Sequence, residues 1–396
     1  MIAAQSLHKL HNAFLPAYMC LLVILTNLSQ MPTLVDAGIT QFLSVPAWII
    51  LFLYCFFTKR FPRVHAFLLF FSLSGFFALF YLMASALDEA YSRTALPSVI
   101  FLATFILLCS SAVARSLDKA DIDRVFTCYI LSVVVVGWSV YTTYIAVTNE
   151  LFAETRMYLY DAKNSISQIL LSAWILILFT KMGTRFWIRM AYILIFLLLT
   201  YEILMLQSRA SIIGMPIALA IAVWKGGVSK NTRLYACIII FAILVALSYS
   251  GIFNYVRDFI LFAGRNADNL NDISSGRSLE WVEFPALFEQ HPFFGIGRCK
   301  RESLILTSLL EFGIIGGVPI LLMAILPLNF VFKAFRVMKN DPVFITFIVV
   351  VLVYLLNGVF EQLAPFGPGA KCFFLWFLYG ILATKYYDGK SRRNIC

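Results

Sequence analysis

The chain has 396 residues, of which 61% are hydrophobic and only 13% are charged, and phenylalanine (38) outnumbers lysine and arginine together (31). Soluble domains carry roughly 45–50% apolar and about 25% charged residues, so this composition excludes an ordinary soluble globular protein. The formal net charge of +10 does not require a nucleic-acid partner, because lysine and arginine gather in the cytoplasmic loops of membrane proteins for topological reasons.

Long apolar runs predict about twelve membrane-spanning helices, at roughly 20 residues for each crossing. The first run has no small-residue cleavage site and is followed by many others, so we expect a span there rather than a removed signal peptide. We therefore expect residues 1–396 to form a single polytopic all-α membrane domain. In chain order the predicted spans are 13–28, 38–57, 64–86, 94–114, 125–147, 165–180, 187–206, 210–224, 234–252, 304–332, 343–360 and 371–386.

The distribution of positive charge predicts the orientation of these spans. Of the 31 lysines and arginines, 20 fall on the side that carries both termini and 11 fall on the other side. The positive-inside rule then puts both termini in the cytoplasm. The eight cysteines have no spacing typical of a metal site, so we expect neither a metal nor another cofactor.

The segment 251–303, between the ninth and tenth predicted spans, is the longest loop outside the membrane. Within it, residues 275–290 mix Trp281 and Phe284 with Arg277 and Glu280. This pattern predicts an amphipathic helix at the outer membrane interface, with a bend near Pro285.

Positive charges on the external side are scarce, and two of them need a reason. Arg209 lies in a short turn between two spans, and Arg277 lies in the long loop. Two guanidinium groups can hold a lipid-linked diphosphate through bidentate, charge-assisted hydrogen bonds while the lipid tail lies among the helices. Plainer roles stay open: Arg209 anchors a helix end or pairs with Glu202, Arg277 pairs with Glu280, and Lys163 is a solvated loop lysine.

Several short motifs follow one another between residues 160 and 316. They are Lys163-Asn164-Ser165, Ser208-Arg209-Ala210, Gly276-Arg277 followed by Trp281, His291-Pro292-Phe293-Phe294-Gly295-Ile296-Gly297, and the glycine-containing stretch from Leu306 to Gly316 around Glu311. In this order they resemble the signature of the bacterial O-antigen ligase and Wzy-type O-antigen polymerase superfamily. The first 150 residues are similar to that superfamily only in hydropathy.

The resemblance implies a GT-C-like, metal-independent membrane glycosyltransferase that uses an undecaprenyl-diphosphate-linked glycan at the periplasmic face of the bacterial inner membrane. It also implies that Arg209 and Arg277 bind or activate the diphosphate. Ligases of this family typically have a histidine nine residues before the glutamate that corresponds to Glu311. This chain has Glu302 there, which favours an O-antigen polymerase over a ligase that transfers glycan to lipid A-core.

Glu302 is predicted to accept the proton of the acceptor hydroxyl, because desolvation at a membrane edge raises the pKa of a carboxyl group. Its plainer alternative is an ion pair with Lys300 or Arg301. Glu311, about two turns into the tenth span, either serves the site or pairs with a neighbouring helix. The residues assigned to substrate binding are Lys163, Asn164, Arg298, Lys300, Arg301 and Glu311.

Two other classes of protein fit the hydropathy. A twelve-span secondary transporter predicts repeated halves and broken helices with polar groups at mid-membrane, and neither pattern is visible in the sequence. A structural membrane protein does not need an arginine-rich external loop. Besides the lipid-linked glycan and membrane lipid, the polymerase interpretation implies a chain-length regulator and a flippase as partners, and no nucleic acid.

Overall fold

The computed structural model describes residues 2–58, 64–145, 163–181, 185–206, 208–225, 276–299, 301–367 and 372–393, and these residues form helices without any strand. The elements in chain order are α1 (Ile2–Leu28), α2 (Pro32–Asp36), α3 (Thr40–Phe57), α4 (Val64–Leu87), α5 (Glu89–Ser92), α6 (Leu96–Val113), α7 (Lys119–Val140), the π-helical turn η1 (Tyr141–Ile145), α9 (Lys163–Leu176), the π-helical turn η3 (Ile177–Lys181), α10 (Phe186–Met205), α11 (Arg209–Lys225), α15 (Arg277–Gln290), α16 (Leu304–Met338), α17 (Pro342–Phe360) and α18 (Phe373–Arg393).

The helices agree with the predicted spans. Each predicted span coincides with a described helix, except 234–252, which lies outside the described residues. Within the described residues, seven helices are long and apolar enough to cross a membrane, and three more apolar helices are shorter. The chain is therefore an all-α, multi-pass membrane protein, and the total of twelve spans stays a prediction.

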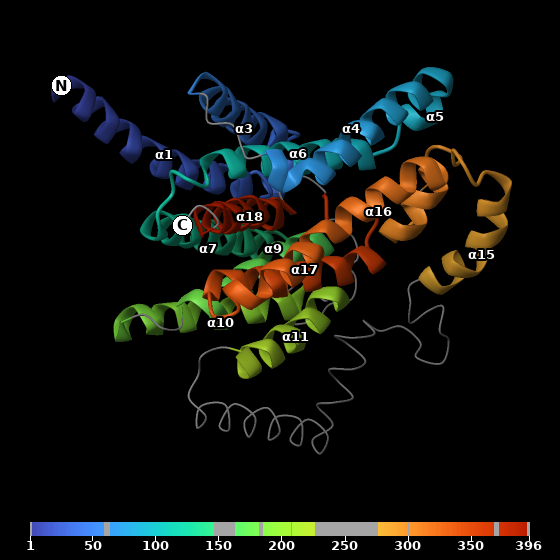
Figure 1. The fold of residues 1–396 in the computed structure, drawn as a ribbon. Helices are drawn as coiled ribbons and strands as arrows, with labels where there is room; N and C mark the ends of the chain where they lie inside the picture. Colours follow the sequence, from blue (N-terminus) through green and yellow to red (C-terminus); the bar gives the residue numbers. More distant parts are fainter. Residues whose placement is uncertain are drawn as a thin grey trace, which may run out of the picture.

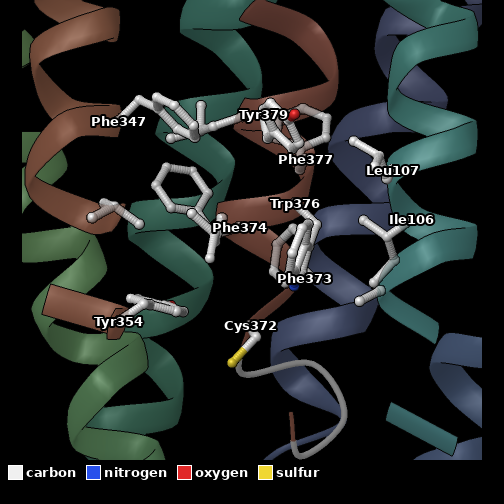
Figure 2. Close-up of a cluster of buried hydrophobic side chains, with 14 of the residues drawn as sticks. Ile106, Leu107, Phe347, Tyr354, Cys372, Phe373, Phe374, Trp376, Phe377 and Tyr379 are labelled. Carbon is white, nitrogen blue, oxygen red and sulfur yellow. The ribbon is translucent and has the colours of Figure 1, made fainter. Parts of the chain in front are cut away.

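The core of the bundle forms around α18, between α6 and α17 (Figure 2). The first two turns of α18 are rich in aromatic residues, and their side chains are buried. Trp376 lies 5.3 Å from the stacked ring of Phe366 and 5.1 Å from the ring of Phe70, measured between ring centroids. Tyr379 stacks on Phe347 at 6.0 Å. Such ring pairs add to the stabilisation that comes from burial, so the last predicted span lies at the centre of the bundle.

Several helices expose large apolar side chains on their outer faces. Leu79 and Met83 of α4 are 66% and 68% exposed, and Trp187 of α10 is 82% exposed. A soluble monomer rarely exposes so much contiguous apolar surface, whereas lipid covers it without cost. These faces are the lipid-contacting sides of peripheral helices.

The predicted site residues lie at one end of the bundle because of the directions in which the helices run. α9 and α17 run antiparallel, because Asn164 contacts Glu361 and, two turns further along α9, Ser172 contacts Tyr354. α10 returns alongside α9, and α11 begins four residues after α10 ends. The starts of α9, α11 and α16, the end of α17, and α15 therefore share one end, at the right of Figure 1, which we call the α15 end.

Candidate active site

Arg277 is the centre of a charged cluster at the α15 end. It is the first residue of α15 and follows Gly276, whose φ of +85° is a left-handed conformation that favours glycine. Its guanidinium Nη2 lies 2.5 Å from Oε2 of Glu302 and 3.9 Å from Oε1 of Glu361. The Arg277 side chain is only 17% exposed, whereas that of Glu302 is 48% exposed. This half-buried arginine is thus held by two carboxylates from different parts of the chain.

Glu361 joins this cluster to α9. Its Oε1 accepts a hydrogen bond from Nδ2 of Asn164 at 2.5 Å. Sequence reasoning missed Glu361, although the signal was present: an acidic residue directly follows the predicted span 343–360 at its external end. One turn earlier, Asn357 is buried, and its Oδ1 makes no hydrogen bond within the described residues.

Two carboxylates of α15 hold the segment that enters α16. Glu280 Oε2 accepts a hydrogen bond from the backbone N–H of Glu302 at 2.9 Å, and Glu283 Oε2 pairs with Nη1 of Arg301 at 3.1 Å. Leu279 and Val282 of the same helix are exposed. Phe284 and Phe288 of α15 are half-buried, whereas Glu289 is exposed, so polar and apolar side chains are not separated onto two faces. The segment is helical as predicted, and its amphipathic placement at a membrane interface stays a prediction.

The segment after α15 docks into a break in α16. Gly313 has φ +60°, which interrupts the helix and leaves the carbonyls of the preceding residues free to accept other hydrogen bonds. The backbone N–H groups of Ile296 and Gly297 donate to the carbonyls of Leu310 and Glu311 at 2.8 and 3.1 Å. In return, Ile314 N–H donates to the Pro292 carbonyl at 2.8 Å. The motif 291–297 and the motif 306–316 therefore form one structural unit.

Glycine is required on both sides of this contact. A Cβ added to Gly313 would lie 2.3 Å from the carbonyl carbon of Phe293, and a Cβ on Gly295 would lie 2.5 Å from that of Glu311. The Tyr91 hydroxyl donates to the carbonyls of Phe294 and Gly295, both at 3.1 Å. Burial raises the pKa of Tyr91, so the phenol keeps its proton and remains a donor.

Glu311 holds the same loop. It is buried in α16, and its Oε1 accepts the backbone N–H of Cys299 at 3.2 Å. The partner that the structure gives Glu311 is thus a loop residue and not a neighbouring helix, and its role in the site stays a prediction. Arg298 is exposed, and its backbone N–H donates to the Ala90 carbonyl at 3.2 Å. The side chain of Lys163 and the whole of Lys300 lie outside the described residues.

Arg209 is the first residue of α11 and is half-buried at the α15 end. The hydroxyl of Ser208, just before it, is buried and makes no hydrogen bond within the described part of the chain. Glu202 is buried against Gly137 of α7, and neither of its carboxylate oxygens is hydrogen-bonded to a described residue. The predicted pair between Glu202 and Arg209 is therefore absent there.

Two expected ion pairs have other partners. Arg277 pairs with Glu302 and not with Glu280. The reason is that Arg277 is the first residue of α15, and the first turn of this helix faces the segment that enters α16. Arg301 pairs with Glu283 of α15 and not with the adjacent Glu302. The adjacent side chains of Arg301 and Glu302 thus meet different residues of α15, Glu283 and Arg277 respectively.

Two N–H donors of the charged cluster have no hydrogen-bond partner in the described part of the chain. The Nε groups of Arg277 and Arg301 are buried and make no hydrogen bond within the described residues. Buried donors without a partner are uncommon in native proteins and point to a ligand or ordered water. An anion that took the place of the Glu302 carboxylate would receive the bidentate arginine contact that a phosphate requires.

Residues 193–308 match the family model described as O-antigen ligase. The matched segment includes most of α10, all of α11 and α15, and the start of α16, and with them Arg209, Arg277 and Glu302. No curated protein matches the chain. The family match confirms the resemblance that the short motifs indicated.

Proposed function

We propose that the chain transfers a glycan from undecaprenyl diphosphate to a hydroxyl acceptor, as a glycosyltransferase of the O-antigen ligase and polymerase superfamily. The observation that carries the proposal is the ion pair of the half-buried Arg277 with Glu302, 2.5 Å apart, inside the segment that matches the family. An arginine that binds the diphosphate then stands directly beside a carboxylate that accepts the proton.

In this mechanism, substrate binding and base activation are one event. The diphosphate takes the guanidinium face of Arg277 and displaces the Glu302 carboxylate from it. Arg209, at the same end of the bundle, adds a second cation. Glu302 is then released from its ion pair, and its carboxylate is free to accept the proton of the acceptor hydroxyl.

The chemical step exchanges one bond for another. The acceptor oxygen bonds to the anomeric carbon of the donor glycan while the bond from that carbon to the diphosphate oxygen breaks. The hydroxyl proton passes to Glu302, and the negative charge that develops on the diphosphate is stabilised by Arg277 and Arg209. Preorganised cations at developing charge are usually the largest single contribution to such catalysis.

We propose repeat-unit polymerisation as the reaction, because a carboxylate, Glu302, stands nine residues before Glu311 where ligases of the family typically have a histidine. Transfer to lipid A-core by a ligase is the second candidate, and the family match favours it equally. Deleting the gene and running the surface polysaccharide on a gel distinguishes them. Single-unit product indicates a polymerase, whereas loss of attached polymer with retained lipid-linked polymer indicates a ligase.

We propose that the α15 end is periplasmic and that both termini are cytoplasmic in the bacterial inner membrane. The warrant is charge: the opposite end carries the arginines and lysines of short loops, such as Arg115, Lys181 and Arg336. Residues 251–303 would then form one periplasmic loop, of which 276–299 and 301–303 are described.

The two arginines test the diphosphate site. Arg277→Lys and Arg209→Lys keep the charge but lose the planar fork that makes two parallel hydrogen bonds. Both variants should fail to make polymer at wild-type protein level. Wild-type polymer from either lysine variant would show that the corresponding arginine is only a helix anchor.

A further inference from the structure

A cavity of about 1150 Å³ opens at the end of the bundle opposite to α15. It lies between the start of α7, the turn that joins α16 to α17, and the last turns of α18. It shares no residue with the candidate active site. Because a typical small-molecule pocket has about 300–1,000 Å³, this volume suits an extended ligand.

The rim of the cavity is basic. Lys119 of α7 and Lys390 of α18 are exposed, and neither makes a hydrogen bond or ion pair within the described residues. A third lysine, Lys385, is half-buried and donates to the Leu117 carbonyl at 3.0 Å. These lysines come from two helices that are far apart in the sequence, so the folded bundle alone brings them together.

Among the described residues, the two acidic side chains at the cavity are fewer than its three lysines. Asp123 forms an ion pair with Lys181, which is 2% exposed. Asp341 caps α17, since its Oδ1 accepts the backbone N–H of Val343 at 2.9 Å. Since Asp123 is balanced by Lys181, the three lysines of the cavity face only the charge of Asp341, and the net charge offered to a ligand is positive. A net positive charge selects an anionic group.

The wall below this rim is apolar. Ile122 and Phe126 of α7 and Ile381 and Leu382 of α18 line the cavity, and all four are buried in the bundle. A free phosphate or nucleotide gains nothing from such a wall. A ligand with an anionic head and hydrocarbon chains matches both parts.

We propose that this cavity binds an anionic phospholipid, with its head group at Lys119 and Lys390 and acyl chain along the apolar wall. Basic pockets between membrane helices bind anionic lipid head groups on the same physical grounds. The site is separate from the glycosyl-transfer site and stands independently of the proposed function.

The test is binding of fluorescent phosphatidylglycerol to the delipidated, detergent-purified full chain, followed by anisotropy. The double variant K119Q/K390Q should bind roughly 30-fold more weakly, at about 1 kcal/mol for each lysine. The matched control R185Q/K333Q removes two exposed positive charges at the same end, at positions that neither line the cavity nor adjoin a residue that does, and should stay within about threefold. Equal losses in both double variants would overturn the proposal.

Two further measurements separate a lipid from other occupants. Val343→Trp narrows the cavity from its rim while every lysine is kept, and should also weaken phosphatidylglycerol binding at least tenfold. Unlabelled phosphatidylcholine and millimolar inorganic phosphate should not displace the probe. Displacement by phosphate, equal binding of phosphatidylcholine, or full binding by the Val343→Trp variant would each contradict a lipid seated in this cavity. Because Lys119, Lys390, Arg185 and Lys333 are exposed, both double variants should elute and unfold like the wild type. Val343→Trp should also elute like the wild type, because Val343 lies in the first turn of α17 and is only half-buried.

Discussion

Replacing Glu302 with glutamine separates a proton acceptor from a merely structural ion pair. Glutamine keeps the size and polarity of the side chain, and the backbone N–H of residue 302 still donates to Glu280. The change removes only the negative charge that faces Arg277, 2.5 Å away. Fold and lipid-linked substrate binding should both survive.

The two interpretations predict effects of very different size. The Glu302 side chain is 48% exposed, and exposed ion pairs contribute roughly 0–1 kcal/mol to stability, so the fold should lose little. A positioned base contributes roughly 10²–10⁴-fold to the rate. That range corresponds to about 3–5 kcal/mol of activation free energy. A large loss of turnover with a small loss of stability is therefore the signature of the base.

The assay is the polymerisation rate of purified protein in nanodiscs with lipid-linked repeat units, alongside thermal unfolding. Glu89→Gln is the matched control, because Glu89 pairs with Arg93 at the same distance of 2.5 Å outside the cluster. Glu302→His should restore part of the activity, since histidine can also accept the proton. A Glu302→Gln rate within about threefold of wild type would eliminate Glu302 as the base. Attention would then move to Glu280, Glu283, or a mechanism with no protein base.

Gly313→Ala should abolish activity and lower the unfolding temperature, because alanine at φ +60° costs roughly 1–2 kcal/mol and its Cβ would lie 2.3 Å from the docked loop. Gly38→Ala, at φ +69° with open space around it, isolates the strain; equal effects of the two changes would mean that loop docking is unimportant. For the orientation, an impermeant thiol reagent applied to spheroplasts should label Glu289→Cys but not Lys339→Cys in a cysteine-free background. The reverse labelling would put the Arg277 cluster in the cytoplasm.

Hydrophobicity along the chain was enough to predict the helices of the bundle. A run of about 20 apolar residues has few alternatives to a membrane helix, since every backbone group must be satisfied inside the segment. The short motifs were likewise sufficient to indicate the family and to single out Arg209, Arg277 and Glu302. Local patterns of this kind need no knowledge of which helices become neighbours.

The partners in the ion pairs of the charged cluster could not be predicted from the sequence in the same way. Sequence distance favoured Glu280 for Arg277 and Arg301 for Glu302, yet the structure joins Arg277 to Glu302 and to Glu361, which follows it by 84 positions (361 − 277). Helix order alone does not say that the end of α17 meets the start of α9, where Asn164 holds Glu361.

The sequence by itself determined which segments form apolar helices, which end of each is basic, and which motifs indicate the family, because these follow from local composition and spacing. Only the tertiary structure decided which carboxylates face Arg277, that the 291–297 loop fits the break at Gly313, and that lysines of α7 and α18 share a cavity. The physical reason is that a membrane crossing is stabilised by its own residues, whereas an ion pair or a docked loop depends on distances between helices that packing alone sets.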